Sequence, residues 1–158
     1  VFTADHGEEN GDYGLLFKQT FLETSARVPM LVSMPGRTPG TVDAPVELMD
    51  LGPTLCDLLG LSPQLVHARS LAPLMRGEAP KKQMLVSQIF GETMLLHRGY
   101  KAVFNQRDEV YLLFDRQRDP EERENLAGSC QMRSLENALH EDLLAWRLQL
   151  NTTGGNPS

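Results

Sequence analysis

The sequence predicts a mixed α/β fold in two parts, the second of which is a small antiparallel sheet covered by one helix. Three observations lead to this prediction. Four short apolar segments, separated by turn residues, follow one another in the second half of the chain, as in an antiparallel meander. A long segment near the C-terminus carries leucines at three- and four-residue steps, as in an amphipathic helix. The first half instead mixes strand-like and helix-like segments, which is typical of an α/β layer.

The second part is predicted from its periodicity. Strands are expected at residues 84–89, 93–97, 100–104 and 110–114. The closing helix is expected over residues 134–150, and its apolar stripe should lie on one face of the sheet. This stripe consists of Leu135, Leu139, Leu143, Trp146 and Leu150. Residues 151–158 are polar and are predicted to form a flexible tail.

The first part begins with a predicted buried strand at residues 1–4, which leads directly into a glycine-rich loop. A helix is expected over residues 50–59, with Asp50 as its cap, its leucines on one face and Gly60 just after its end. Three further elements are expected: a short helix at 20–26, a strand at 28–34, and a short helix at 70–76 with a serine cap.

Composition excludes several classes of protein. The chain has 158 residues, 41% of them hydrophobic and 23% charged, which is typical of a folded globular protein. Its net charge of -6 argues against a nucleic-acid-binding protein, because no basic stripe is present to contact phosphates. No apolar segment approaches the roughly 20 residues that span a bilayer.

The two cysteines, Cys56 and Cys130, could form a disulfide. Cys56 lies in an apolar helical segment, however, and a free, buried thiol is therefore the favoured interpretation.

Candidate metal ligands follow the first strand. Asp5 and His6 lie just after its end, where open α/β sheets place their ligands. A carboxylate suits Ca²⁺ or Mn²⁺, and an imidazole tolerates Mn²⁺ or Zn²⁺. Two ligands do not complete a site; Glu8, Glu9 and Asp12 could do so, or these acids could simply form a solvated loop. Lys18 either extends to solvent or directs a cation at an anionic substrate.

Several motifs together resemble the type I sulfatases of the alkaline phosphatase superfamily and their phosphonate-monoester-hydrolase relatives. The stretch DHGEENGDYGLLFKQTFLETSARVPMLVSMPG resembles the family's Asp-His-Gly-Glu, Gly-Asp-His-Gly-Leu, Lys, Arg-Val-Pro and Pro-Gly series. Three later stretches are similar to further motifs of the family and appear here in the same order: VELMDLGPTLCDLLGL, ARSLAPLMRGE and YKAVFNQRDEVYLLFDRQRDPEERENLA. The likeness covers nearly the whole chain.

This resemblance implies a fold and an organisation. The chain would be the C-terminal part of an alkaline-phosphatase-like α/β sandwich plus a small antiparallel-sheet-and-helix subdomain. Residues 1–80 would form the end of the catalytic core, residues 81–150 the subdomain, and residues 151–158 the tail.

The resemblance also implies roles. Asp5 and His6 would be metal ligands, on Ca²⁺ or alternatively Mn²⁺, and Lys18 would bind the sulfate and assist its leaving group. The substrate would be a sulfate ester of a small molecule or a sugar.

The chain departs from the family pattern in two places. Tyr13 replaces the histidine of Gly-Asp-His-Gly. The family's nucleophile is a formylglycine made within Cys/Ser-x-Pro-Ser-Arg, and neither cysteine lies in that motif. We therefore expect the formylglycine and two further ligand aspartates in a missing N-terminal part, and expect the fragment alone to be inactive. Two alternatives stay open: a phosphonate or phosphate ester hydrolase of the same superfamily, and a non-catalytic remnant that acts as an interaction module.

Overall fold

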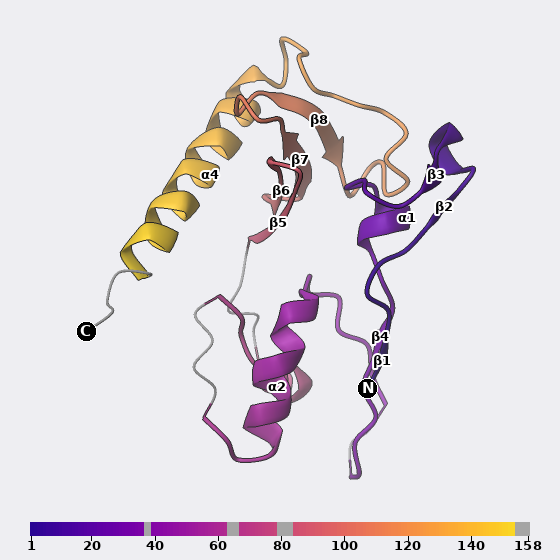
Figure 1. Cartoon of the computed structure of the whole chain (residues 1–158), viewed down its shortest axis with the longest axis vertical. Coiled ribbons are helices and arrows are strands. Elements are labelled where there is room, and N and C mark those ends of the chain that lie inside the picture. The colour runs from indigo at the N-terminus through magenta and orange to yellow at the C-terminus, as the bar shows by residue number, and fades with distance from the viewer. Residues whose placement is uncertain (37–38, 63–66, 79–83, 154–158) are drawn as a thin grey trace.

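The centre of the structure is a four-stranded antiparallel sheet in the second half of the chain (Figure 1). This computed structural model describes residues 1–36, 39–62, 67–78 and 84–153. The strands pair in the order β5-β6-β7-β8, which confirms the predicted meander. Their bounds are Leu85–Ile89 for β5, Glu92–His97 for β6, Tyr100–Phe104 for β7 and Val110–Asp115 for β8. The predicted boundary at residue 80 lies outside the described residues.

Two of the turns in the sheet have the geometry that tight hairpins require. Phe90-Gly91 joins β5 to β6 and Arg98-Gly99 joins β6 to β7, and all four residues have positive φ angles. Two-residue hairpin loops with positive φ at both central positions match the right-handed twist of the flanking strands. These turns set the pairing register, in which Leu95 lies opposite Ala102.

A long helix covers one face of the sheet. Helix α4 (Arg133–Thr153) buries Leu139 and Leu143 completely against sheet residues that include Leu95 and Phe104. Figure 1 shows this helix running along one side of the sheet. The predicted helix and its apolar stripe are confirmed. The predicted tail begins too early, because α4 continues through residues 151–153; residues 154–158 lie outside the described residues.

The first part of the chain covers the other face of the sheet. Phe21 packs against Met94 and Val103, whose side chains alternate along their strands with those that contact α4. Strand β7 is therefore buried almost throughout, because both of its faces are covered. None of the described helices combines the length and the hydropathy of a membrane span.

The first part contains short elements joined by long loops. They are β1 (Phe2–Thr3), β2 (Glu9–Asn10), a 3-10 turn η1 (Asp12–Gly14), β3 (Leu16–Phe17), helix α1 (Glu23–Ala26) and β4 (Met30–Leu31). Strand β1 pairs with β4 and β2 pairs with β3, both antiparallel. The prediction of a buried first strand is wrong for this chain. Val1 and Phe2 are 61% and 65% exposed, because β1 lies in a two-stranded sheet with β4 and not inside a larger sheet.

The helices that follow leave several of their leucines exposed. They are a 3-10 turn η2 (Leu48–Asp50), α2 (Leu51–Leu58) and α3 (Ala72–Met75). The predicted helix is confirmed, but its leucines are not the buried side: Leu55 and Leu58 are exposed, and Pro53 and Thr54 are buried instead. The reason is that the Thr54 hydroxyl accepts the Leu71 backbone N–H, which draws that side of the helix towards α3. Cys56 and Cys130 are both free, as predicted, although Cys56 is only partly buried.

A buried ion cluster connects the two parts. The side chain of Lys101, on β7, is 1% exposed, and its ammonium group contacts the carboxylates of Glu23 at 2.6 Å and Glu122 at 2.5 Å. The same ammonium donates to the Phe21 carbonyl at 2.9 Å. Glu122 in turn accepts the Glu23 backbone N–H at 2.8 Å. The cluster therefore fixes the start of α1 to the sheet, and its charges compensate one another away from water.

Replacing Lys101 with methionine keeps the apolar stem and removes the charge. We expect Lys101→Met to lower the free energy of unfolding by about 3–5 kcal/mol, because the buried Glu122 carboxylate loses its counter-ion and the partly buried Glu23 loses one of its partners. Urea unfolding of the purified protein, followed by circular dichroism, measures this change. The control is Arg118→Met, which removes an exposed cation beside Asp115 and should change the free energy by less than about 1 kcal/mol. Equal losses in the two variants would contradict the role given to the cluster.

Candidate functional site

The three side chains singled out in the sequence lie together in the structure. The Lys18 ammonium nitrogen is 2.5 Å from Nε2 of His6, although twelve residues separate them in the chain. A carboxylate oxygen of Asp5 lies 3.4 Å from the same imidazole nitrogen. Asp5 is largely exposed and His6 partly buried, so the group opens to solvent on one side. A carboxylate, an imidazole and an ammonium group thus converge on one point.

The orientation of His6 is set by its own backbone neighbour. Its Nδ1 lies 2.8 Å from the carbonyl oxygen of Gly7. A carbonyl can only accept a hydrogen bond, so Nδ1 is the protonated nitrogen. In the neutral ring Nε2 is then left as an acceptor, directed towards Lys18 and Asp5. This is the arrangement in which a histidine can bind a metal ion through Nε2.

Gly7 allows the ligand-bearing segment to lie close to α1. Its backbone N–H donates to the Ser25 carbonyl at 2.8 Å. A Cβ atom at Gly7 would lie 1.9 Å from the carbonyl oxygen of Thr24, which no side chain can accommodate. The glycine is therefore required because Asp5 and His6 are held directly against the helix backbone.

The backbone on both sides of Lys18 is strained. Phe17 has a φ of 71° and Gln19 a φ of 88°, both in the left-handed region that non-glycine residues rarely adopt. Such conformations cost about 1–3 kcal/mol each and persist where the surroundings impose them. Phe17 is also 73% exposed, so burial of its ring does not explain the conformation. The strained segment directs Lys18 back over β2 to His6.

The other acidic residues of the loop do not join Asp5 and His6. Glu9 is buried and bonded to two threonine hydroxyls, and Glu8 and Asp12 are exposed. Within the described part of the chain, no group of three or more histidine, cysteine, aspartate or glutamate side chains could hold a metal ion. The local completion of a site by Glu8, Glu9 and Asp12 is therefore wrong. Asp5 and His6 still fit a divalent cation in chemistry, as a hard carboxylate beside an imidazole with a fixed acceptor.

Tyr13 anchors the tip of the same loop to the second part of the chain. Its hydroxyl donates to the backbone carbonyl of Glu121 at 2.5 Å. Burial, followed by the charges of Glu122 and Glu9, raises the pKa of this hydroxyl above its ordinary value, which keeps it protonated as a donor. No local pattern in the sequence indicates this contact, because 108 residues separate the partners.

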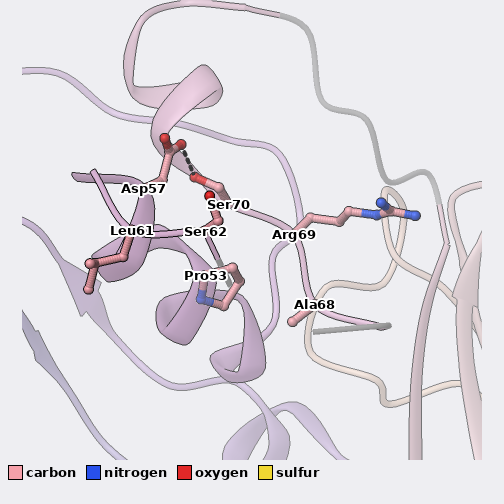
Figure 2. Close-up of a pocket in the computed structure, with 7 residues that line it drawn as sticks. All are labelled: Pro53, Asp57, Leu61, Ser62, Ala68, Arg69 and Ser70. Atoms are coloured by element: carbon pink, nitrogen blue, oxygen red, sulfur yellow. Dashed lines mark hydrogen bonds between the residues drawn. The ribbon is translucent and has the colours of Figure 1, made fainter. Parts of the chain in front are cut away.

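The structure also contains a pocket that does not belong to this group. It has a volume of about 390 Å³ and lies beside α2, where Ser70 donates to Asp57 at 2.7 Å. Figure 2 shows Arg69 extending away from these two side chains. Asp5, His6 and Lys18 do not line it. We therefore place the candidate active site at the Asp5, His6 and Lys18 group.

Comparison with known proteins places the chain among the sulfatases. Residues 11–149 match the family described as N-sulphoglucosamine sulphohydrolase, C-terminal. A choline-sulfatase of Rhizobium meliloti (strain 1021) is 35% identical over 136 residues, which cover 80% of this chain and 26% of that protein. An arylsulfatase K of Xenopus laevis is 31% identical over 147 residues, covering 81% of this chain and 27% of the relative. The chain thus spans about a quarter of the length of these two relatives.

A solved structure confirms the predicted fold class. The phosphonate monoester hydrolase of Agrobacterium radiobacter superposes with a TM-score of 0.78 at 27% identity, covering 94% of this chain and 34% of that one. Three observations lead to the same family: the mixture of antiparallel sheets and helices, the order of the motifs, and the family match. The chain belongs to the sulfatase family whose model is described as N-sulphoglucosamine sulphohydrolase, C-terminal.

Proposed function

We propose that the protein containing this chain hydrolyses sulfate esters, with Asp5, His6 and Lys18 as part of its active site. The observation that carries the proposal is the convergence of the Lys18 ammonium on His6 Nε2, beside Asp5. The family match and the likeness to a choline-sulfatase and an arylsulfatase K support the reaction class. The substrate would be a sulfate ester of a small molecule or a sugar.

Lys18 would act on the sulfate group and its leaving oxygen. Cleavage of the ester bond to sulfur builds negative charge on that oxygen, and a fixed ammonium group stabilises this charge. The strained backbone on either side of Lys18 holds the ammonium at one position before substrate arrives. Less reorganisation is then needed when the charge develops, which lowers the barrier.

Asp5 and His6 would hold a divalent cation, Ca²⁺ or alternatively Mn²⁺. When bound, the cation would supply positive charge to oxygen atoms of the ester and of the nucleophile. The Gly7 carbonyl would keep His6 in the tautomer that presents Nε2. The nucleophile, a formylglycine in the family pattern, and further metal ligands would come from sequence outside these 158 residues.

Removal of the Lys18 ammonium tests the assignment. We expect Lys18→Ala, in the intact enzyme, to lower kcat for an aryl sulfate by about 100-fold or more, because a fixed charge on the leaving oxygen is lost. The readout is the steady-state release of the phenol. Arg107→Ala, which removes an exposed cation from the turn between β7 and β8, is the control and should retain the wild-type rate. A Lys18→Ala enzyme with the wild-type kcat would contradict the role of Lys18.

The same proposal predicts the behaviour of residues 1–158 in isolation. We expect no turnover of an aryl sulfate, with or without added Ca²⁺ or Mn²⁺, because Lys18 and two ligands do not supply a nucleophile. Release of sulfate from the purified 158-residue chain, measured by ion chromatography, checks this. Clear metal-dependent hydrolysis would show that the chain contains a complete site.

Phosphonate or phosphate ester hydrolysis is the second candidate. The structural match to a phosphonate monoester hydrolase favours it, and a carboxylate and imidazole pair suits either substrate. Parallel assays of the intact enzyme with a phenyl sulfate and a phenyl phosphonate separate the two. A larger kcat/KM for the sulfate supports our proposal, and a larger value for the phosphonate supports the second candidate.

A further inference from the structure

We propose that Glu9 is a positioning residue that holds the strained segment around Lys18. The inference rests on the proposed function, because it assigns Glu9 the task of fixing the ammonium group that acts on the substrate. Glu9 does not touch His6 or Asp5; it acts through the backbone and through two threonines.

Glu9 is a buried acid whose two oxygens are both used. Glu9 is 1% exposed, although its neighbours Glu8 and Asn10 are both exposed. One carboxylate oxygen accepts the hydroxyl of Thr20 at 2.9 Å, and the other accepts the hydroxyl of Thr24 at 2.6 Å. A buried carboxylate is costly to desolvate, and these two hydrogen bonds offset part of that cost. A carboxylate buried in this way does not contribute to solubility, and this points to a structural role.

Glu9 contacts the chain both before and after Lys18. Glu9 lies opposite Phe17 in the β2-β3 pair, which fixes the residue before Lys18. Its side chain bonds to Thr20, which fixes the chain two residues after Lys18. Of the two left-handed residues, Phe17 is the first point of attachment and Gln19 lies between the two points. Their strain is sustained because the segment is held at both ends.

The second threonine connects this arrangement to α1. Thr24 lies in α1 and bonds to Glu9 through its hydroxyl, while its carbonyl lies against Gly7. The segment that carries Lys18 and the segment that carries His6 are therefore both held in place by contacts with α1. Without the carboxylate, Thr20 and Thr24 lose their common acceptor, and Lys18 is free to leave its position beside His6.

A double-mutant cycle in the intact enzyme tests the inference. The four forms are wild type, Glu9→Gln, Lys18→Ala and the double variant, assayed with an aryl sulfate. We expect Glu9→Gln to lower kcat by about 10- to 100-fold with little change in KM, because a displacement of about 1 Å costs that much. In the Lys18→Ala background the same change should have no further effect on kcat, because the group that Glu9 positions is already absent.

Two results would overturn the role of Glu9. One is an unchanged kcat in Glu9→Gln, and the other is an equal loss in the presence and absence of Lys18, which indicates a general structural effect. A wild-type kcat in Lys18→Ala alone would instead overturn the proposed function. The two failures are therefore distinguishable. Glu141→Gln, an exposed acid on α4, is the matched control and should retain the wild-type kcat.

A second pair of variants covers the case in which Glu9→Gln does not fold, as judged by its thermal unfolding curve. Thr20→Val removes the hydroxyl while keeping the shape of the side chain, and Thr20→Ser keeps the hydroxyl. We expect Thr20→Val to show the same Lys18-dependent loss of kcat, and Thr20→Ser to restore most of it. Equal activity of these two variants would overturn the inference.

Discussion

The ion cluster around Lys101 is the interaction on which the geometry of the candidate site depends. Lys101 lies in the middle of the sheet, and through Glu23 and the Phe21 carbonyl it fixes the start of α1. A carbonyl of helix α1 then accepts the Gly7 backbone N–H, and the Thr24 hydroxyl of α1 donates to the Glu9 carboxylate. The positions of Asp5, His6 and Lys18 thus follow from contacts that begin in the sheet. Because the Lys101 ammonium and the Glu122 carboxylate are buried, removing either one leaves an uncompensated charge, so the connection is costly to break.

In this arrangement the small sheet also holds the segment that carries the candidate site. One face is covered by α4 through an apolar contact, and the other receives the loop segment through Phe21 and the ion cluster. Tyr13 adds a second attachment, since it bonds to Glu121, the neighbour of Glu122 in the cluster. The family pattern has a histidine at the position of Tyr13. Here the side chain fastens the loop to the second part of the chain.

The elements that the sequence predicted well are those with strong periodicity. The strands of the meander and the long helix have regular apolar spacing and glycine-containing turns, and their bounds are correct to within about three residues. The leucines of α2 are spaced as regularly, but their spacing does not tell which side of the helix is buried, because polar contacts of Thr54 decide this. Local patterns also miss buried charges: nothing near Lys101 in the sequence indicates that its partners lie at positions 23 and 122.

The candidate site was predictable in its residues but not in its geometry. Asp5, His6 and Lys18 were identified by their chemistry and by a family resemblance, and no spacing rule places Lys18 against His6 across twelve residues. Their contact depends on left-handed backbone at Phe17 and Gln19, which a sequence pattern would assign to glycine. The supporting residues Glu9, Thr20 and Thr24 look like ordinary loop residues until their hydrogen bonds are known.

The most direct test of the central claim, that Asp5 and His6 form the metal-binding side of an active site opposite Lys18, is a crystal structure of the intact enzyme grown with Mn²⁺. The measurement is the anomalous difference density of the metal. Our account predicts a peak within coordination distance of an Asp5 carboxylate oxygen and of His6 Nε2, with the Lys18 ammonium displaced from Nε2 and facing the ion across the substrate position. A peak elsewhere in the enzyme, with Asp5 and His6 unliganded, would contradict it.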